Sequence, residues 1–161
     1  MPIRTATPED LSTLYQIGCT CFPPAEMVPA EEYANRLRIY PHHFWVMELD
    51  NGRLAGFLNG MVTDEPTIRD EMFLNADLHR EHGGWQAILG LAVLPQYQKH
   101  GYASRLMEHT IASARAQGRR GCILTCKQAL IPYYKRFGYQ DLGVSQSAYG
   151  GVIWHDMTLT F

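Results

Sequence analysis

The stretch WQAILGLAVLPQYQKHGYAS, residues 85–104, carries the strongest structural signal of the chain. Its first ten residues form a dense apolar run, which is typical of a buried central strand. From Ser104 a helical pattern begins, with Leu106 and Met107 on one face, and Gly118 closes it. The stretch therefore predicts a buried strand, a tight turn and a long helix in direct succession.

The turn itself contains the pattern Gln98-x-x-Gly101-x-Ala103. A glycine there lets the chain turn tightly and lets its backbone approach a ligand closely. The free N–H groups at the helix start point outward together, and the helix dipole adds positive potential, an arrangement that suits a pyrophosphate. Three nearby side chains add candidate contacts: Lys99, His100 and Arg105. Taken alone, the pattern also fits an ordinary strand-to-helix turn.

Strand and helix patterns alternate on both sides of this unit. Strand patterns cover residues 3–7, 44–50, 53–63, 121–126 and 152–161, with a further short strand expected near 139–142. Helix patterns cover residues 8–20, 29–40 and 131–138. Residues 64–84 show no clean period and predict a long loop with at most a short helical piece. This order predicts an α/β (α+β) protein with a mixed sheet and helices on both faces.

Length and composition narrow the class of protein. The 161 residues fit a single domain, residues 1–161, and 46% apolar residues are enough for a continuous core. The formal net charge of −2 shows no basic excess, so no nucleic-acid partner is expected. No apolar run approaches the about 18 residues of a membrane span, and residues 1–11 lack the pattern of a signal peptide. We therefore expect a cytoplasmic protein with no membrane partner.

Neither a disulfide nor a metal site is expected. Of the four cysteines, Cys19 and Cys21 are too close for an easy bridge in a helix, and the other two lie in the predicted strand 121–126. In a reducing compartment all four are expected to be small core residues. A structural zinc site requires two close pairs of Cys or His ligands. His79 and His82 have H-x-x-H spacing and His42 and His43 are adjacent, but a zinc site is not the favoured interpretation.

A second motif lies downstream, in the expected helix of residues 131–138. Residues 130–139 read LIPYYKRFGY. Together with the turn around Gly101, in the same order and at a similar distance, this segment resembles the signature of the GNAT superfamily of acetyltransferases. The resemblance implies the GNAT fold: a central mixed, mostly antiparallel sheet of six to seven strands flanked by about four helices. It also implies acetyl-CoA as co-substrate and no metal.

A closer resemblance covers most of the chain. Four segments look like the arylalkylamine (serotonin-type) N-acetyltransferases and their bacterial relatives: Val28–Glu31, Leu91–Val93, Thr125-Cys126 and Gly150-Gly151. The resemblance implies that Leu91, Ala92 and Val93 contact substrate and the pantetheine arm. It implies that Thr125 lies beside the amine and Tyr134 beside the cofactor sulfur. The implied cofactor-binding segment consists of Gln98, Lys99, His100, Gly101, Tyr102, Ala103 and Ser104.

The chain departs from this family at one important place. The animal enzymes carry two histidines just before the Leu-Ala-Val segment, where they relay protons. Here those positions are Ala87 and Leu89, whose side chains cannot relay protons. The sequence therefore leaves open both the general base and the acceptor amine.

The chemistry of amide formation assigns candidate catalytic roles. A free alkylamine titrates near about 10 and must lose a proton before it attacks a thioester. A backbone N–H near Leu91 is the natural stabiliser of the oxyanion, and Tyr134 is the candidate acid for the leaving thiolate. The candidate bases come from the long loop, and histidine has the most suitable pKa. They are His79 and His82, followed by Asp77 and Glu81. Each of these also fits a solvated polar loop.

The acceptor site is expected near the proline-rich segment 22–29. Phe22, Pro29 and Trp85 are candidates for an apolar wall over an arylalkylamine. Glu26 is a carboxylate that can face a cationic amine. The same residues fit equally well as packing between the helix pair and the sheet.

The leading hypothesis is an N-acetyltransferase acting on a small primary amine, with acyl transfer by direct attack in a ternary complex. One alternative is a protein or peptide acceptor, at an N-terminus or a lysine. A polyamine is another, for which the acidic segment Asp64–Glu71 provides a candidate groove. From a different class, the chain fits a non-catalytic acyl-CoA-binding sensor, although an intact Tyr134 argues against it. The sequence is compatible with a monomer or a homodimer.

Overall fold

Nine β-strands form two sheets in residues 2–161, the residues that this computed structural model describes. The first sheet has the order β1-β2-β3-β6, with strands at Ile3–Thr5, Phe44–Glu48, Leu54–Asn59 and Gly90–Val93. The second has the order β4-β5-β7-β9-β8, with strands at Val62–Thr63, Trp85–Ala87, Gly121–Cys126, His155–Thr160 and Gln140–Val144. All neighbouring strands are antiparallel except β5 and β7, which are parallel.

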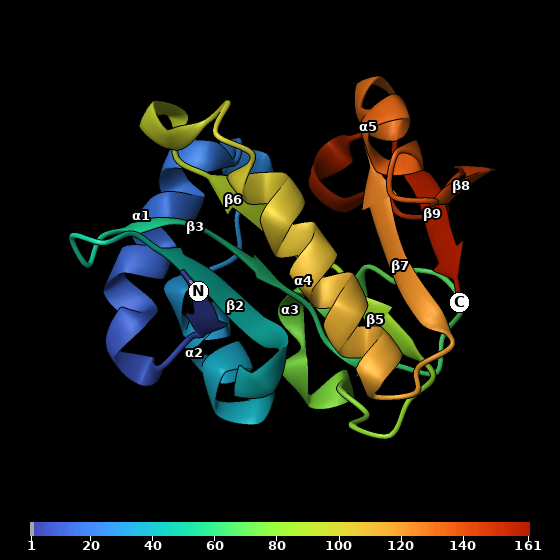
Figure 1. Cartoon of the computed structure of the whole chain (residues 1–161). Helices are drawn as coiled ribbons and strands as arrows, with labels where there is room; N and C mark the ends of the chain where they lie inside the picture. The colour runs from blue at the N-terminus through green and yellow to red at the C-terminus, as the bar shows by residue number, and fades with distance from the viewer. Residues whose placement is uncertain (1) are drawn as a thin grey trace.

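Helices cover both faces of the strands (Figure 1). Helices α1 (Leu11–Cys21) and α2 (Ala30–Ile39) pack on one face, and α4 (Tyr102–Ala116) lies across the other. Two short helices, α3 (Glu71–Leu74) and α5 (Ile131–Lys135), lie at the ends of strands. Short 3₁₀ turns occupy Pro8–Asp10, Pro24–Glu26, Pro41–His43, Ala76–Leu78, Pro95–Tyr97, Gln128–Leu130 and Tyr149–Gly151.

Strand β2 shows why helices are needed on both faces. All of Phe44, Trp45, Val46 and Met47 are buried. Successive side chains point to opposite faces, so Phe44 and Val46 pack with α1 and α2, whereas Trp45 and Met47 pack with α4. A strand apolar on both sides must be covered on both sides.

The apolar run of residues 85–94 changes partner in its middle. Ile88 N–H donates to Ile123 O at 2.9 Å, and Leu89 N–H donates to Asn59 O at 2.8 Å. Strand β5 before this point pairs with β7, whereas β6 after it pairs with β3. Because no ladder joins β6 to the end of β7 among the described residues, a gap opens between the two sheets.

The predicted fold class is confirmed, but the described residues form nine strands in two sheets rather than one sheet of six to seven. The strands divide into two sheets because the single strands expected at 53–63 and 85–94 are each broken, the first into β3 and β4 and the second into β5 and β6. The final strand is shorter than expected, since Tyr149–Gly151 forms a 3₁₀ turn and β9 begins only at His155. The expected loop of residues 64–84 contains α3 and one 3₁₀ turn.

The cysteines are all free, as expected. Cys122 and Cys126 are buried in β7, but the expectation of a core position is wrong for Cys19, whose side chain is exposed on α1. None of the helices in residues 2–161 is long and apolar enough to cross a membrane.

Candidate functional site

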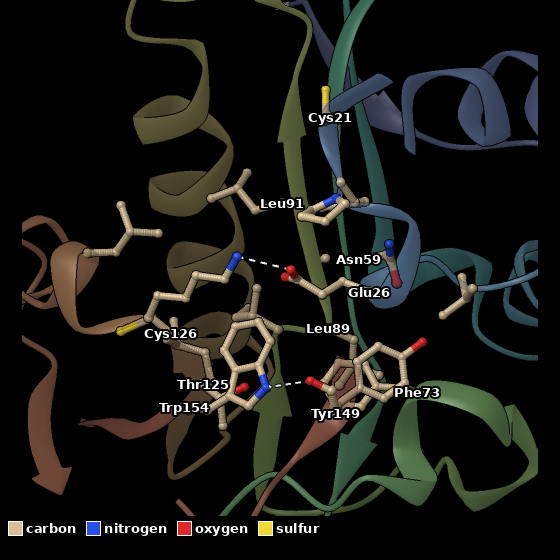
Figure 2. Close-up of a pocket in the computed structure, with 18 of the residues that line it drawn as sticks. Cys21, Glu26, Asn59, Phe73, Leu89, Leu91, Thr125, Cys126, Tyr149 and Trp154 are labelled. Atoms are coloured by element: carbon tan, nitrogen blue, oxygen red, sulfur yellow. Dashed lines mark hydrogen bonds and ion pairs between the residues drawn. The ribbon is translucent and has the colours of Figure 1, made fainter. Parts of the chain in front are cut away.

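A cavity of about 240 Å³ occupies the gap between β6 and β7. Its walls come from the segment after α1, from β6, from the end of β7, from α5 and from the segment before β9 (Figure 2). Most of the wall is apolar, and a few polar side chains converge on it. Such concave, mostly apolar sites with placed polar groups are typical of small-molecule binding.

Strand β6 presents unused backbone donors to this cavity. Leu94 N–H donates to Ala55 O at 2.9 Å, and residues 91 and 92 pair with Leu58 and Phe57 of β3. N–H groups alternate sides along an antiparallel strand, so the N–H of Leu91 points away from β3. It faces the gap, and Leu91 lines the cavity. The expected position of the oxyanion donor is therefore consistent with the backbone.

Tyr134 of α5 lines the same cavity and is 9% exposed. Burial raises the pKa of its phenol, so the group keeps its proton at neutral pH. Its neighbour Tyr133 points elsewhere, and the two hydroxyls of Tyr133 and Ser104 lie 3.1 Å apart. Tyr134 is thus a protonated O–H in the wall of the cavity, as a general acid must be.

The two cysteines in the cavity wall are poor nucleophiles. Burial raises the pKa of the Cys126 thiol to about 11, and burial also raises the pKa of Cys21. A thiol reacts as its thiolate, which both environments disfavour. The cavity therefore favours direct transfer over a covalent cysteine intermediate.

The turn before α4 has the geometry of an anion cradle. Lys99 and Gly101 both have left-handed backbone angles, with φ of 67° and 80°. The first helical hydrogen bond of the turn runs from Arg105 N–H to Gly101 O at 3.0 Å, which leaves the N–H groups of residues 102–104 without helical partners. A Cβ at Gly101 would meet no atom within 4 Å, so the space in front of it is open.

The other residues of this segment hold the turn in shape. Gln98 Nε2 donates to Val93 O at 3.1 Å, which ties the turn to β6. His100 Nδ1 lies 3.0 Å from Tyr97 O and 2.9 Å from Gln98 O. These contacts fit a pyrophosphate-binding loop and place Tyr102, Ala103 and Ser104 at the helix start.

The predicted acceptor residues divide into two groups. Phe22, Glu26 and Thr125 line the cavity. Pro29 instead precedes the first residue of α2, and Trp85 lies in β5 beside a second hollow at the opposite end of the sheet. Leu89 lines the cavity, whereas Ala87 is completely buried and does not.

A C-terminal segment that sequence reasoning missed closes one side of the cavity. Tyr149 stacks on Phe73 with ring centres 4.3 Å apart, and its hydroxyl donates to Met27 O at 3.0 Å. Trp154 Nε1 donates to Tyr149 O at 2.8 Å (Figure 2). Two aromatic residues around Gly150-Gly151 were the available signal, but their partners lie far away in the sequence.

An ion pair spans the cavity. Lys127 Nζ and Glu26 Oε2 lie 3.0 Å apart, although the residues are 101 positions apart in the chain (Figure 2). The Glu26 side chain is 11% exposed, while that of Lys127 is 43% exposed. The pair links the N-terminal and C-terminal walls and places one carboxylate inside the cavity.

Arg36 and Asn59 line the inner end of the cavity. Together with Glu32 and Tyr40, which are buried but do not line the cavity, they form what we call the cavity cluster. Arg36 donates through Nη1 to Asn59 Oδ1 at 2.8 Å and through Nη2 to Phe73 O at 2.7 Å. Its Nε lies 3.9 Å from Glu32 Oε1.

Each member of the cavity cluster keeps an unpaired polar atom. Within residues 2–161 these atoms are Glu32 Oε1, Arg36 Nε, Tyr40 Oη and Asn59 Nδ2. Leaving one buried donor or acceptor unpaired costs about 1–3 kcal/mol. Sequence reasoning missed the cluster because Arg36 and Glu32 read as ordinary surface charges of a helix.

The candidate bases His79 and His82 do not line the cavity. His82 borders the second hollow beside Trp85. His79 belongs to what we call the histidine network: His43, His79, Glu81, Gln86 and Arg119. The structure therefore gives no support to His79 or His82 as the base. The acidic segment Asp64–Glu71 also lies outside the cavity lining.

The ligand atoms of His43, His79 and Glu81 lie within 4.8 Å of one another, close enough to suggest a metal site. His79 Nδ1, however, accepts the Val62 N–H at 3.0 Å, so its proton lies on Nε2, 3.0 Å from Glu81 Oε1. A neutral imidazole binds a metal through an unprotonated nitrogen, which His79 does not offer here. The arrangement is better explained as a hydrogen-bond network.

The model of the acetyltransferase (GNAT) family matches residues 11–139. The chain belongs to this family. The matched range includes the gap between β6 and β7, the turn around Gly101 and Tyr134. The family consists of acetyltransferases, so the chain is assigned to the acyltransferases.

The individual relatives share 30% or less of their residues with this chain. A serotonin N-acetyltransferase from Mesocricetus auratus is 30% identical over 95 residues, which cover 58% of this chain and 44% of that protein. The match thus spans less than half of the relative's length. The GNAT-like decarboxylase GphF, in complex with isobutyryl-CoA, is 20% identical with a TM-score of 0.81, and 99% of each chain is covered. The ribosomal-protein alanine N-acetyltransferase of Escherichia coli is 18% identical with a TM-score of 0.72, covering 98% of this chain and 92% of that one. The two structural likenesses show the fold alone.

Proposed function

We propose that this GNAT-family chain is an acetyl-CoA-dependent N-acetyltransferase that acts on a small primary amine. One observation carries the proposal: a single cavity brings together a free backbone donor of β6, a protonated Tyr134 and an acceptor end lined by aromatic side chains. These are the groups that amide formation from a thioester requires.

The turn before α4 fits the pyrophosphate of acetyl-CoA. Open space in front of Gly101 and the free N–H groups of residues 102–104 support this assignment. Leu91, Ala92 and Val93 of β6 would accompany the pantetheine arm toward the cavity. Acetyl-CoA supplies the activated acetyl thioester when it is bound there.

The N–H of Leu91 stabilises the oxyanion that develops on the acetyl carbonyl. Tyr134 donates its proton to the sulfur as the thiolate leaves, and its raised pKa keeps that proton available at neutral pH. Glu26 faces the incoming ammonium, which loses its proton to this carboxylate directly or to water. Holding both reactants in one cavity supplies much of the acceleration through proximity.

The mostly apolar, aromatic lining of the acceptor end favours a small amine. Aromatic side chains of Phe22, Phe73 and Tyr149 line it, and the Glu26–Lys127 pair crosses it. The similarity to a serotonin N-acetyltransferase agrees with this choice. A peptide N-terminus is the second candidate, favoured by the structural likeness to a ribosomal-protein alanine N-acetyltransferase and by the polar inner end around Arg36.

A thiol-release assay tests the proposal. The purified chain is incubated with acetyl-CoA and a panel of amines: tryptamine, phenethylamine, spermidine and short peptides with free N-termini. We expect amine-dependent release of coenzyme A and an acetylated amine by mass spectrometry. Acetyl-CoA should also raise the melting temperature of the protein, as any ligand of the folded state does. A thermal shift without transfer to any amine would indicate a binding protein and contradict the proposal.

A further inference from the structure

The orientation of the Asn59 side chain is fixed by Arg36. The guanidinium of Arg36 has only donors, and its Nη1 lies 2.8 Å from Asn59 Oδ1. The amide must therefore turn its oxygen toward Arg36 and its nitrogen the other way. Asn59 lies on the inner wall of the cavity and is completely buried (Figure 2).

The amide nitrogen of Asn59 faces the first residue of β6, which follows the break between β5 and β6. A Cβ added to Gly90 would lie 3.2 Å from Asn59 Nδ2, 3.4 Å from Phe57 and 4.0 Å from Phe22. The missing side chain of Gly90 thus leaves room beside Nδ2. That nitrogen has no hydrogen-bond partner among the described residues. Buried donors without partners are rare in proteins, so a donor in a cavity wall is a candidate contact for an oxygen of a ligand or of water.

The charges that line the cavity agree with an oxygen ligand. Glu26, Arg36 and Lys127 line the wall; of these, Arg36 contacts Asn59, and its ion-pair partner Glu32 does not line the cavity. A second ammonium group near Asn59 would meet N–H donors and the Arg36 guanidinium. An oxygen with lone pairs would instead accept from Nδ2.

We propose that Asn59 is a specificity-determining residue that donates a hydrogen bond from Nδ2 to a carbonyl or carboxylate oxygen of the acceptor. The inference rests on the proposed function and names its substrate class: an amine whose α-carbon, the carbon bonded to the nitrogen, carries a carbonyl or carboxylate group. Amino acid amides, amino acids and peptide N-termini share this chemistry. Arg36 is the positioning residue that holds the Asn59 amide in the required orientation.

The location of Nδ2 sets the distance between oxygen and amine. The attacking nitrogen must approach the acetyl carbonyl beside the Leu91 N–H, and Asn59 Nδ2 lies beside Gly90, the preceding residue. An oxygen held there is only a few bonds from the attacking nitrogen. A phenolic oxygen at the far end of an arylalkylamine would lie too far from the reaction centre for this contact.

The test uses matched amines and the variant Asn59→Asp. Aspartate keeps an oxygen toward Arg36 and replaces the Nδ2 donor with an acceptor. Phenylalaninamide and phenethylamine share the aryl group and the amine but differ in the carbonyl oxygen. We expect the kcat/KM for phenylalaninamide, divided by the kcat/KM for phenethylamine, to fall about tenfold or more in the variant. Most of the loss should be in the kcat/KM for phenylalaninamide. Comparing wild type and variant cancels the different basicities of the two amines.

Further substrates show where on the acceptor the recognised oxygen lies. Phenylalanine and a dipeptide should follow phenylalaninamide if the oxygen is the recognised feature. If Asn59→Asp lowers kcat/KM most for tyramine, the recognised oxygen lies at the far end of the acceptor from its amine, and the proposed substrate class is wrong. An unchanged ratio in Asn59→Asp would overturn the role of Asn59, while activity of the wild type on any amine would leave the proposed function intact.

A second variant tests the proposal even if Asn59→Asp does not fold. Gly90→Ala adds a methyl group 3.2 Å from Nδ2 and fills the space for the oxygen without changing the amide. It should lower the same ratio, and an unchanged ratio there would also count against the proposal. Loss of transfer to every amine in the wild type, by contrast, would contradict the proposed function itself.

Discussion

The cavity cluster and the histidine network are both groups of polar side chains packed against the sheets, yet their hydrogen bonding differs, and so does their burial, since Glu81 of the histidine network is 54% exposed. In the cavity cluster, Glu32, Arg36, Tyr40 and Asn59 each keep an unpaired atom. In the histidine network, no member has a buried unpaired atom among residues 2–161. A polar group left incomplete in a cavity wall, as at Arg36 and Asn59, is a candidate ligand contact, whereas a completed network holds the fold together.

The histidine network connects loop segments to neighbouring strands and to the segment after α4. Gln86 Nε2 donates to Gly60 O and Ala87 O, both at 2.9 Å, and its Oε1 lies 3.0 Å from His43 Nδ1. Arg119 donates to the backbone oxygens of Glu81 and Gly83 at 2.6 and 2.9 Å. The network therefore fastens the long loop before β5 to the start of β2 and to the end of α4.

The largest expected effect tests whether the cavity cluster also carries stability. Arg36→Met removes a guanidinium that is 2% exposed; it leaves Glu32 without its ion-pair partner and Asn59 Oδ1 and Phe73 O without their donor. Breaking a buried ion pair in this way should lower the free energy of unfolding by about 3–5 kcal/mol. Urea unfolding checks it. The matched variant is Arg119→Met, whose ion partner Glu81 is 54% exposed and which should therefore cost less. Equal losses in the two variants would contradict the distinction between the clusters.

The next effect separates chemistry from stability within the cavity. Tyr134→Phe removes the proposed acid and should lower kcat about 100-fold, which corresponds to about 2.7 kcal/mol of transition-state free energy. The melting temperature should hardly change, because the Tyr134 hydroxyl donates to no residue of the described chain. Steady-state kinetics over a range of pH provide the measurement.

Tyr133→Phe is the control for Tyr134→Phe. It removes the hydroxyl that lies 3.1 Å from Ser104 Oγ, and it leaves the proposed acid in place. We expect a much smaller change in kcat. If both variants lowered kcat alike, or if Tyr134→Phe left the rate and its pH profile unchanged, Tyr134 would not be the acid.

Much of the fold could be predicted from local signals. The apolar run of residues 85–94, the glycine at 101 and the helical period up to Ala116 place β6, the turn and α4 correctly. Cavity residues close to these motifs, such as Leu91 and Tyr134, were predictable for the same reason. Their positions follow from contacts that are short in sequence.

The rest of the site depends on contacts between distant residues. Arg36 and Asn59 are 23 positions apart, and Glu26 and Lys127 are 101 apart. No period or motif links such pairs in a single sequence. His79 was misleading for a related reason, since its intrinsic pKa suits a base but its hydrogen bond from Val62 N–H holds it in the histidine network.

A third effect tests the histidine network directly. Gln86→Leu keeps the approximate shape of the side chain but leaves Gly60 O, Ala87 O and His43 Nδ1 without their partner. Buried groups left unpaired should lower the free energy of unfolding by about 1–3 kcal/mol. The substrate ratio that reports on Asn59 should stay the same, because Gln86 does not line the cavity. A changed ratio with unchanged stability would reverse the roles of the two clusters.

The smallest expected effect is on the pH dependence of the free energy of unfolding. Burial alone would raise the pKa of Glu81, but hydrogen bonds from His79 and His43 lower it to about 2. Burial lowers the pKa of His43, with partial opposition from Glu81. Both folded-state values lie below the ordinary ones, so both groups contribute stability that is fully present above about pH 6.5. The His43 contribution is lost first on acidification, and the Glu81 contribution is lost between about pH 4.5 and 2.

Glu81→Gln removes the second of these contributions. The variant should lose less stability than the wild type between about pH 4.5 and 2, and the difference should be below about 1 kcal/mol because the side chain is largely in solvent. Urea unfolding at several pH values measures it, with Glu65→Gln as the control, since Glu65 pairs with Arg69 on the exposed surface. Parallel pH curves for wild type and Glu81→Gln would show that the carboxylate contributes nothing through its histidines. The completed network would then depend on Gln86 and Arg119 alone, and its contrast with the cavity cluster would rest on neutral hydrogen bonds and backbone contacts.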